Sequence, residues 1–414
     1  MLIEFRVTNF RSIRGEQILS MVAAKDASHA TTNVTPTGLA AIPHTVRSAV
    51  VYGANAAGKS NLIAALAFMR EVVATSATQL VEGQRFNCQP FKLSKQTAKA
   101  PSEFEITFLI DGVRHQYGFK LNSERVVEEW LLVYKTAKAQ QWFRRTVAGG
   151  KDVYEFSVHF TGKRKLWEES TRSNALFLST ATQLNSELLR PVFLWVTQGM
   201  NVIGAGMQPV FDFTIAMAKD ASGKGELLRF LEAADLSIID FSLELKKVQE
   251  VGVLIGPGKP PAQTITEVER AFVRFVHKSD KELASFEMHE ESVGTQRLFA
   301  FAGPILDVLR HGRVLVVDEL DGSLHPLMVR YLVKLFHSEL NKHGAQLIFT
   351  THDTSLLDQS LFRRDQIWFV EKDRSQSTRL YPMTDFSPRK NEALERGYLA
   401  GRYGALPFLS DLRT

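Results

Sequence analysis

The alternation of apolar and polar residues predicts β-structure in two early parts of the chain. Residues 1–22 alternate with a period of two on either side of Gly15, which predicts a β-hairpin. The same pattern returns at 103–135, where Asp111 and Gly112 predict a tight turn, because this pair tolerates positive φ. We therefore expect antiparallel strands in the N-terminal third of the chain.

A different pattern follows the first hairpin and returns near the end. The apolar run 46–52 predicts a buried strand, and a helix with one apolar face is expected from Lys59 onward. From residue 294, predicted helices and strands alternate. The expected elements are a helix at 294–311, a strand at 313–320, a helix at 326–342 and a strand at 345–352. This alternation favours an α/β fold with a mostly parallel sheet.

The middle of the chain mixes both patterns. Residues 160–235 are predicted to be mainly helical, above all around 174–189 and 223–235. Strands are expected at 238–245 and 271–290. The expected loop between these strands is the Gly/Pro-rich segment 256–261. The chain has no sustained heptad repeat, which excludes a long coiled coil.

Composition narrows the class of protein. Hydrophobic residues make up 44% and charged residues 23% of the 414 residues, as in ordinary globular proteins. A chain of this length is expected to form two lobes or to carry an insertion. It has no apolar run long enough for a membrane span, and its charged N-terminus does not resemble a signal peptide. With Cys88 as its single cysteine, a cytoplasmic protein without a membrane partner is expected.

A glycine-rich loop carries the clearest chemistry. Gly53, Gly58, Lys59 and Ser60 fit the pattern G-x-x-x-x-G-K-[ST], between an apolar strand and an apolar-periodic helix. Glycines let backbone N–H groups turn toward phosphates, and the start of the helix adds a partial positive charge. Lys59 is expected to reach the β- and γ-phosphates, and the Ser60 hydroxyl to bind Mg²⁺. The pattern therefore predicts a site for ATP and Mg²⁺.

Two later strands end in polar residues that fit the same site. Asp318 and Glu319 follow an apolar strand, which places them at the carboxyl edge of a parallel sheet, where such folds bind ligands. Asp318 is expected in the Mg²⁺ shell, and Glu319 is expected to polarise the attacking water. The next strand ends in His352, which is expected to sense the γ-phosphate or to position water.

A third segment lies just before the acidic strand. Ser292, Gly294 and Thr295 are expected at the start of a helix, with N–H groups and hydroxyls available. Such residues form an ordinary N-cap. They also suit a second phosphate-binding surface, one that reaches a nucleotide held by another subunit.

These motifs, in this order, resemble the ABC-type ATPases of the SMC, Rad50 and RecF kind. The resemblance covers about 1–135 and 285–360, although "ESVGT" departs from the LSGGQ signature. It implies that Asn55 and Asn61 belong to the phosphate loop and that Asp321 is the acid of the loop after Glu319. Gln89 is a candidate for the glutamine that such proteins place near the nucleotide, on loose spacing.

The C-terminal part of the chain resembles a narrower group. "RRDQIWFVEKD" at 363–373 and "RGYLAGRYGALPFLSDL" at 396–412 are similar to AAA-type ATP-binding proteins of bacterial abortive-infection and anti-phage defence loci, relatives of the OLD ATPases. The resemblance implies a homodimer or higher homo-oligomer that forms on ATP. It also implies a separate effector protein, a Toprim- or RloB-like nuclease.

The expected organisation combines these observations. We expect an α/β fold of the ABC-type P-loop ATPase kind, with a mixed sheet, an antiparallel β-subdomain and an inserted, mainly helical segment. The expected domains are an N-terminal lobe at 1–135, the insertion at 136–285 and a C-terminal lobe at 286–414. The predicted function is a Mg²⁺-dependent ATPase that senses or scaffolds in anti-phage defence and controls its effector.

Other function classes fit less well. The missing coiled coil counts against SMC and Rad50 proteins, and the divergent signature counts against a transporter subunit. A self-contained OLD nuclease would need a Toprim domain, and only 62 residues follow His352. A DNA-binding repair ATPase of the RecF or Rad50 type remains the alternative, because the net charge of +5 leaves a nucleic-acid partner open.

Overall fold

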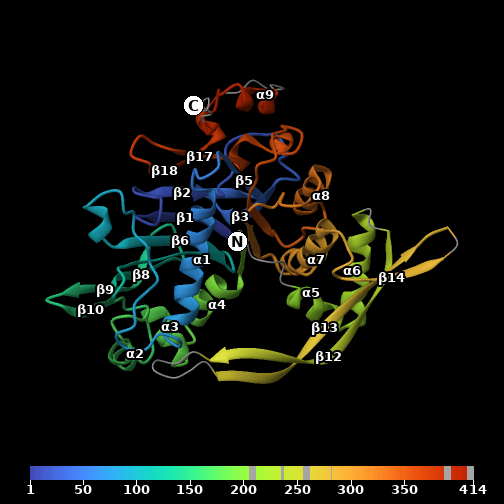
Figure 1. The fold of residues 1–414 in the computed structure, drawn as a ribbon. Helices are drawn as coiled ribbons and strands as arrows, with labels where there is room; N and C mark the ends of the chain where they lie inside the picture. The colour runs from blue at the N-terminus through green and yellow to red at the C-terminus, as the bar shows by residue number, and fades with distance from the viewer. Residues whose placement is uncertain (205–210, 235–236, 255–261, 281, 387–392, 408–414) are drawn as a thin grey trace, which may run out of the picture. The chain divides into compact units, whose positions relative to one another are not determined.

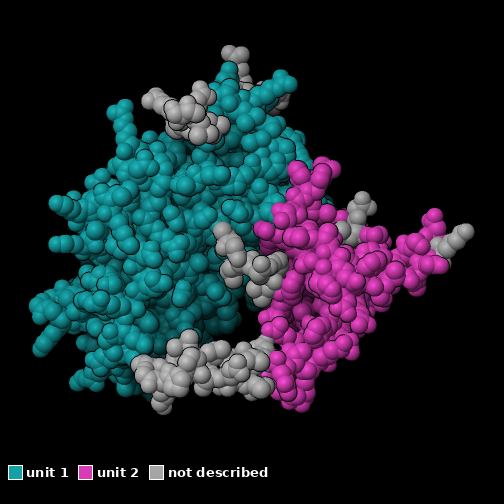
Figure 2. Space-filling view, in the orientation of Figure 1, with its two compact units in different colours: residues 1–206, 308–322, 329–414 teal, residues 207–307, 323–328 magenta. Residues whose placement is uncertain are grey.

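Two β-sheets of different kinds organise the larger of two units into which the chain divides (Figure 1). A computed structural model describes residues 1–204, 211–234, 237–254, 262–280, 282–386 and 393–407. The first unit comprises residues 1–206, 308–322 and 329–414, and the second comprises residues 207–307 and 323–328 (Figure 2). Each unit is thus assembled from segments that are separated in the sequence.

The first sheet has seven antiparallel strands in the order β10-β9-β8-β7-β6-β1-β2. Its strands are β1 (Leu2–Thr8), β2 (Gln17–Ser20), β6 (Ser102–Ile110), β7 (Val113–Leu121), β8 (Val126–Tyr134), β9 (Gln140–Ala148) and β10 (Lys151–Phe156). Asp111 and Gly112 join β6 to β7 with φ values of 48° and 74°. Positive φ at both central residues is typical of a two-residue hairpin turn, so the predicted turn is confirmed.

The second sheet has six strands in the order β11-β15-β16-β5-β17-β18. Its strands are β5 (Ser48–Gly53), β11 (Met200–Ile203), β15 (Val314–Val317), β16 (Gln346–Thr350), β17 (Ile367–Lys372) and β18 (Thr378–Pro382). All neighbours run parallel except β17 and β18. β5 lies between β16 and β17 and is buried along its whole length, which explains its unbroken apolar run. The expected α/β fold with a mixed sheet is confirmed.

Helix α1 (Lys59–Thr75) packs its apolar face into a core that both sheets share. Leu62, Leu66 and Met69 repeat at helical spacing and are buried in one cluster with Phe5 of β1 and Val51 of β5. The helix therefore links the sheet that carries the glycine-rich loop to the antiparallel sheet.

The remaining regular elements of the first unit are short. They are a hairpin of β3 (Val34–Leu39) and β4 (Ile42–Val46), the helices α2 (Arg164–Ser170), α3 (Phe177–Gln183), α4 (Arg190–Gln198), α8 (Pro326–His337) and α9 (Leu394–Leu399), and the 3₁₀ turns η1 (Thr97–Lys99), η2 (Thr354–Leu356), η3 (Arg364–Gln366) and η4 (Met383–Asp385). Of α8, residues 326–328 belong to the second unit. Within the described ranges, none of the helices combines the length and the apolar character that crossing a membrane requires.

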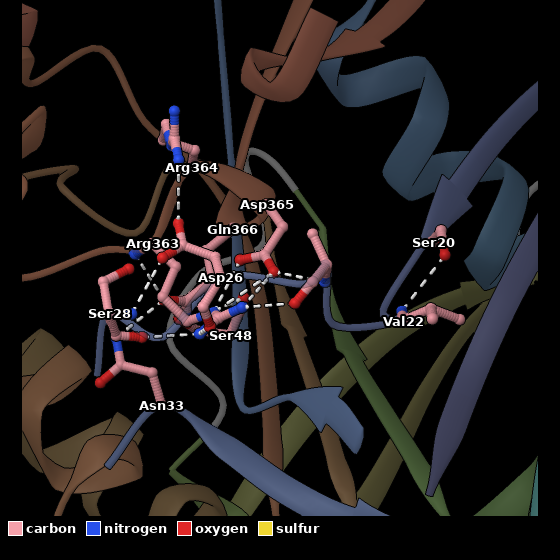
Figure 3. A network of polar contacts seen from close by, with 11 residues as sticks. Ser20, Val22, Asp26, Ser28, Asn33, Ser48, Arg363, Arg364, Asp365 and Gln366 are labelled. Carbon is pink, nitrogen blue, oxygen red and sulfur yellow. Dashed lines mark hydrogen bonds and ion pairs between the residues drawn. The ribbon is translucent and has the colours of Figure 1, made fainter. Parts of the chain in front are cut away.

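A buried polar network fixes the beginning of β5 (Figure 3). The guanidinium of Arg363 donates to the carboxylate of Asp365 at 2.7 Å and to three backbone carbonyls within 24–28. Next to it, the side-chain amide of Gln366 donates to the Ser48 hydroxyl at 2.8 Å. A buried charge is tolerated only when it is paired and hydrogen-bonded, so this network favours one arrangement of these segments. It anchors the strand that leads into the glycine-rich loop.

The second unit is built around a three-stranded antiparallel sheet in the order β12-β13-β14. Its elements are α5 (Asp212–Ala218), α6 (Ala221–Ala233), β12 (Ile238–Leu254), β13 (Ala262–Lys278), β14 (Leu283–Glu287) and the first part of α7 (Val293–His311). β12 and β13 are 17 residues long each, so β12 is much longer than the strand predicted at 238–245. The loop predicted at 256–261 lies outside the described residues.

The division into units differs from the domains expected from the sequence. Strands β9 and β10 extend the antiparallel sheet, and α3 and α4 pack against α1, so residues 136–206 belong to the first unit. Residues 286–307 belong to the second unit, although they were expected in the C-terminal lobe. The reason is that long-range pairing, which local patterns do not encode, decides both boundaries.

Candidate nucleotide-binding site

The glycine-rich loop joins β5 to α1, and two of its positions accept only glycine. A Cβ on Gly53 would lie 2.3 Å from the backbone oxygen of Val370 on the neighbouring strand β17. Gly58 has a φ of 115°, and a Cβ there would lie 2.1 Å from the Thr378 hydroxyl oxygen on β18. The close approach of two neighbouring strands therefore imposes these glycines, and with them the course of the loop.

Lys59 begins α1 and is almost fully buried, with 5% of its surface exposed. Its ammonium donates to the backbone oxygens of Gly53 at 2.7 Å and Ala54 at 3.2 Å. The cation is therefore held over the loop itself. Ser60 and Asn55 are exposed at the start of the helix and within the loop, respectively.

The electrostatic surroundings of Lys59 connect the loop to the acidic strand end. Burial lowers the pKa of Lys59, while the negative charges of Asp318, Glu319 and Asp321 counteract this shift. The three carboxylates are thus close enough to act on the lysine. The sequence-predicted lysine and acids, which are more than 250 positions apart, come together at the carboxyl ends of β5 and β15.

Asp318 and Glu319 are oriented by one threonine of the adjacent strand β16. The Thr350 hydroxyl donates to Asp318 Oδ1 at 2.5 Å and accepts from the Glu319 backbone N–H at 2.7 Å. Asp318 is buried, whereas the Glu319 side chain is exposed. Glu319 has a φ of 52°, in the left-handed region that costs a non-glycine residue energy. The bonds to Thr350 stabilise this turn and hold both acids at the sheet edge.

His352 lies in the loop after β16 and is exposed. Its backbone N–H donates to Asp321 Oδ2 at 3.1 Å. The backbone N–H of Leu320 also donates to the Thr350 backbone oxygen at 3.1 Å. The acidic turn is therefore bonded both to the end of β16 and to the histidine loop that follows it, so a displacement of the turn would move the histidine loop.

Two contacts of the loop were not expected from the sequence. The Asn61 side-chain amide donates to the Ser12 hydroxyl at 2.6 Å, and the Ser12 and Thr378 hydroxyl oxygens are 2.7 Å apart. Thr378 in turn donates to the backbone oxygen of Ala57 at 2.9 Å. Ser12 lies within residues 1–135, which the family resemblance covers, but none of the motifs described above includes it. No local signal marks Thr378.

A cavity of about 630 Å³ opens beside the loop. Its lining includes Ala56 and Asn61 of the loop region, together with Arg11, Lys92 and Lys372. Gln89, the loosely spaced candidate, also lines this cavity, and its backbone oxygen accepts from the Arg11 N–H at 2.7 Å. The cavity is therefore rich in cationic and amide groups.

Ser292, Gly294 and Thr295 form what we call the signature turn (residues 292–295), at the start of α7 in the second unit. The Ser292 hydroxyl oxygen accepts from the Thr295 N–H at 3.1 Å and is 2.9 Å from the Thr295 hydroxyl oxygen. A Cβ on Gly294 would lie 3.0 Å from the Ser323 backbone oxygen, a tight contact. The predicted helix start is confirmed, with Ser292 as its N-cap.

The oxygen donors at the loop suit a magnesium ion. Magnesium binds oxygen ligands, and in phosphate-transferring sites it takes few of them from the protein. The Ser60 hydroxyl, in α1 after β5, and the Asp318 carboxylate, after β15, match this chemistry, and only β16 separates these two strands in the sheet. In the described part of the chain, no group of three or more His, Cys, Asp or Glu side chains has an arrangement that could hold a metal ion.

Solved structures that match this chain include heads of SMC proteins. The SMC head domain from Thermotoga maritima has 12% identity and a TM-score of 0.41, with 92% of this chain and 98% of that chain covered. An SmcHead bound to the C-winged helix domain of ScpA has 14% identity and a TM-score of 0.41, with 92% and 97% covered. An Smc head with an extended coiled coil, bound to the C-terminal domain of ScpA derived from Pyrococcus furiosus, has 12% identity and a TM-score of 0.39, with 92% and 96% covered.

The family comparison gives a match over most of the chain. The search of curated proteins found no match to this chain. One family model matches residues 48–358, a range that includes the glycine-rich loop, the signature turn, both acids and His352. The chain belongs to the family described as "AAA domain, putative AbiEii toxin, Type IV TA system".

Proposed function

We propose that this protein is a Mg²⁺-dependent ATPase that assembles on ATP and controls a separate effector protein in anti-phage defence. The observation that carries the ATPase part is the meeting of Lys59 with Asp318 and Glu319 beside a loop whose course is imposed by its neighbours. A buried cation, a buried acid and an exposed acid at one sheet edge are the groups that phosphoryl transfer requires.

Each residue has a distinct role in the proposed reaction. In the proposed step, water would form a bond to the γ-phosphorus of ATP while the bond from that phosphorus to the bridging oxygen breaks, so that ADP and phosphate are the products. Lys59 binds the β- and γ-phosphates in place of the two carbonyls that it now contacts. Ser60 and Asp318 would hold the magnesium ion, which would offset the negative charge of the phosphates, and Glu319 would accept the proton of the attacking water. His352 positions that water, and its link to Asp321 keeps it near the acids.

The cavity beside the loop suits the base and sugar end of the nucleotide. It adjoins Ala56 and Asn61, so a nucleotide whose phosphates lie on the loop would extend toward it. Arg11, Lys92 and Lys372 do not contribute to recognition of the uncharged base and sugar, but their positive charge attracts the anionic nucleotide toward this side of the loop. Asn61, whose side chain is held by Ser12, follows the loop in sequence and lines the cavity.

We further propose that the site is completed by a second protomer. The signature turn presents a helix start with a serine hydroxyl, which favours phosphate binding. Ser292, Gly294 and Thr295 would contact the γ-phosphate of the nucleotide held by the partner. ATP would then join two protomers, and hydrolysis would release them.

The defence role rests on the family and on the resemblance of the C-terminal segments. The family description names a type IV toxin–antitoxin system, which is consistent with a protein that acts in the bacterial cytoplasm against infected cells. The proposed partner is a Toprim- or RloB-like nuclease that this protein holds or releases according to its nucleotide state.

The test is co-purification of the protein with the product of its neighbouring gene, with ATP and without nucleotide. The expected result is a complex whose amount changes with ATP for the wild type and not for Lys59→Ala. A complex that forms equally in all four conditions would contradict nucleotide control. Loss of ATP hydrolysis in the Lys59→Ala protein would still support the ATPase part, so the two parts are separable.

The purified chain alone is expected to hydrolyse ATP without cutting nucleic acid. The acids of the proposed ATP site are already assigned, Asp318 to the magnesium shell and Glu319 to the role of general base, and two-metal cleavage needs a further acidic cluster. Plasmid, RNA and tRNA are incubated with the protein, ATP and Mg²⁺ or Mn²⁺. Cleavage that persists through purification and disappears in a variant of this chain would show that the chain is itself the toxin.

The alternative is a DNA-binding repair ATPase of the RecF or Rad50 type. The net charge of +5 permits a phosphate-backbone partner. Stimulation of ATP turnover by double-stranded DNA, with a strong dependence on salt, would favour this alternative over effector control.

A further inference from the structure

A histidine of the three-stranded sheet β12-β13-β14, which we call the hairpin sheet, contacts the residue that precedes the signature turn. This residue is Glu291, whose side chain is 9% exposed. Its Oε1 lies 2.6 Å from Nε2 of His277 on β13. The other ring nitrogen of His277, Nδ1, lies 3.1 Å from the Ser237 hydroxyl. The ring of Phe286 on β14 packs edge-on against the imidazole, at 5.1 Å between ring centres. The imidazole is therefore held on both nitrogens and along its edge.

The direction of these bonds follows from their chemistry. A carboxylate only accepts, so Nε2 of His277 donates to Glu291. In the neutral ring Nδ1 then accepts from the Ser237 hydroxyl. This arrangement fixes the tautomer and the ring orientation, and with them the position of the Glu291 carboxylate.

The backbone of Glu291 is fixed as well. The Gln296 side-chain amide donates to the Glu291 backbone oxygen at 2.9 Å. Ser292 follows directly, and its hydroxyl caps the helix through Thr295. A change in the position of Glu291 would therefore move the N-cap hydroxyl and the N–H groups of the turn.

We propose that His277 and Glu291 are positioning residues, which hold the signature turn in the arrangement that completes the nucleotide site of a neighbouring protomer. This inference rests on the proposed ATP-dependent assembly. It implies that the position of the hairpin sheet β12-β13-β14 determines whether the turn can complete the nucleotide site of the neighbouring protomer. A protein bound to the sheet could then change assembly without touching the nucleotide.

The test uses four variants of the full-length protein. Glu291→Ala and His277→Ala remove either side of the contact. Glu291→Gln keeps an acceptor for the histidine N–H but no charge. The matched control is His289→Ala, which removes a histidine that is 78% exposed, three positions before Ser292, with a surface pairing of little value.

Three quantities are measured, namely affinity for a fluorescent ATP analogue, ATP-induced assembly and turnover. Glu291→Ala and His277→Ala are expected to bind the analogue within about twofold of the wild type, since Lys59 belongs to the other unit. Their maximal turnover is expected to fall by about 10- to 100-fold, the effect of misplacing a catalytic contact by about 1 Å, with a matching loss of assembly. Glu291→Gln should recover most of the activity, and His289→Ala should retain it.

A double variant keeps the inference testable if single variants are unstable. If the two residues act through one contact, His277→Ala with Glu291→Ala is no worse than either single change. Additive losses, or wild-type turnover and assembly in both alanine variants, would overturn the inference. A wild-type protein that binds ATP but neither assembles nor hydrolyses it would instead overturn the proposed function.

Discussion

In the first unit the glycine-rich loop is held from several directions, whereas in the second unit the signature turn is held through its neighbour Glu291. The loop contacts β17 at Gly53, β18 at Gly58 and the N-terminal segment through Asn61. The large cluster of buried apolar residues that surrounds α1 lies entirely in the first unit. Many mutually supporting contacts favour a single arrangement of the loop.

The second unit buries fewer apolar side chains than the first unit. Its core centres on Phe299 of α7, whose ring packs edge-on against Phe241 and Phe275 at 5.5 and 5.2 Å between ring centres. Along the hairpin sheet, large apolar side chains such as Leu245 and Phe286 are exposed. A three-stranded sheet against which few other elements pack needs little free energy to open locally.

This difference suggests that the two units have separate roles. The unit with Lys59, Asp318 and Glu319 keeps the nucleotide-binding groups in place, and the unit with the signature turn is the one whose arrangement is easier to change. Nucleotide binding should therefore depend on the first unit, and assembly should depend on both. The following predictions test this separation.

The largest expected effect is on chemistry within the first unit. Glu319→Gln should slow ATP hydrolysis by about 10²–10⁴-fold, because a general base is lost, while ATP binding and assembly persist. Single-turnover hydrolysis and nucleotide affinity are measured together, with Glu339→Gln, an exposed acid after α8, as the control. Unchanged turnover would remove Glu319 from its role and make His352 the next candidate.

The second prediction compares one aromatic residue from the core of each unit. Phe104→Ala in β6 and Phe299→Ala in α7 each remove a fully buried ring, at a cost of about 3–5 kcal/mol. Phe104→Ala should weaken ATP binding, whereas Phe299→Ala should leave binding intact and abolish assembly. Hydrogen exchange should show faster opening in the altered unit. Equal loss of ATP binding in both variants would mean that the units do not act separately.

The third prediction concerns the pH dependence of the first unit. His337 is buried, accepts from the Ser48 hydroxyl at 2.9 Å and has its pKa lowered to about 3, mainly by burial and also by the charges of His29 and Arg47. The unfolded chain takes up this proton near pH 6.5 and the folded chain does not. The contribution of the neutral histidine to stability is therefore present above pH 6.5 and is lost as the pH falls toward 3.

The expected loss is about 1.4 kcal/mol for each pH unit below 6.5. It is measured as the change in unfolding free energy between pH 7 and pH 5.5, for the wild type and for His337→Gln, which keeps an acceptor but does not titrate. The wild type should lose about 1.4 kcal/mol more than this variant. His159→Gln, at an exposed position, should behave as the wild type.

The smallest expected effect is a partial recovery of ATPase activity when two inactive variants are mixed. Lys59→Ala and Ser292→Ala proteins should each be inactive alone, because one unit of every composite site is damaged. Mixed in equal amounts, they should regain about a quarter of the wild-type activity, since half of the dimers contain one intact site out of two. Absence of recovery, with mixed dimers demonstrated, would argue against a site shared between protomers.

The sequence predicted the parts of the fold that depend on local patterns. The turn at Asp111 and Gly112, the helix from Lys59 and the buried strands at 314–317 and 346–350 follow from spacing and from glycine chemistry alone. The region around 174–189 was predicted to be helical, yet α3 ends at Gln183 because Asn185 adopts a left-handed φ of 64°. The positive φ of one residue leaves the spacing of apolar residues unchanged, so the sequence pattern did not predict where this helix ends.

The candidate site shows the same limit. Gly53, Gly58, Lys59 and Ser60 are recognisable because four residue types recur at fixed spacing within one loop. Thr378, which contacts that loop, is separated from Ser12 by 366 positions, and a threonine at the start of an edge strand carries no distinctive pattern. The sequence therefore indicated the residues that we propose to contact phosphate but not the residues that shape the loop.

The bond from Thr378 to the backbone of Ala57 also constrains when the loop can form. These residues are 321 positions apart, and β5 acquires its neighbours β16 and β17 only in the last part of synthesis. A chain emerging from the ribosome therefore exposes its glycine-rich loop long before the strands that give it shape. Nascent chains should not capture ATP, which would protect the proposed ATP-dependent assembly from recruiting incomplete subunits.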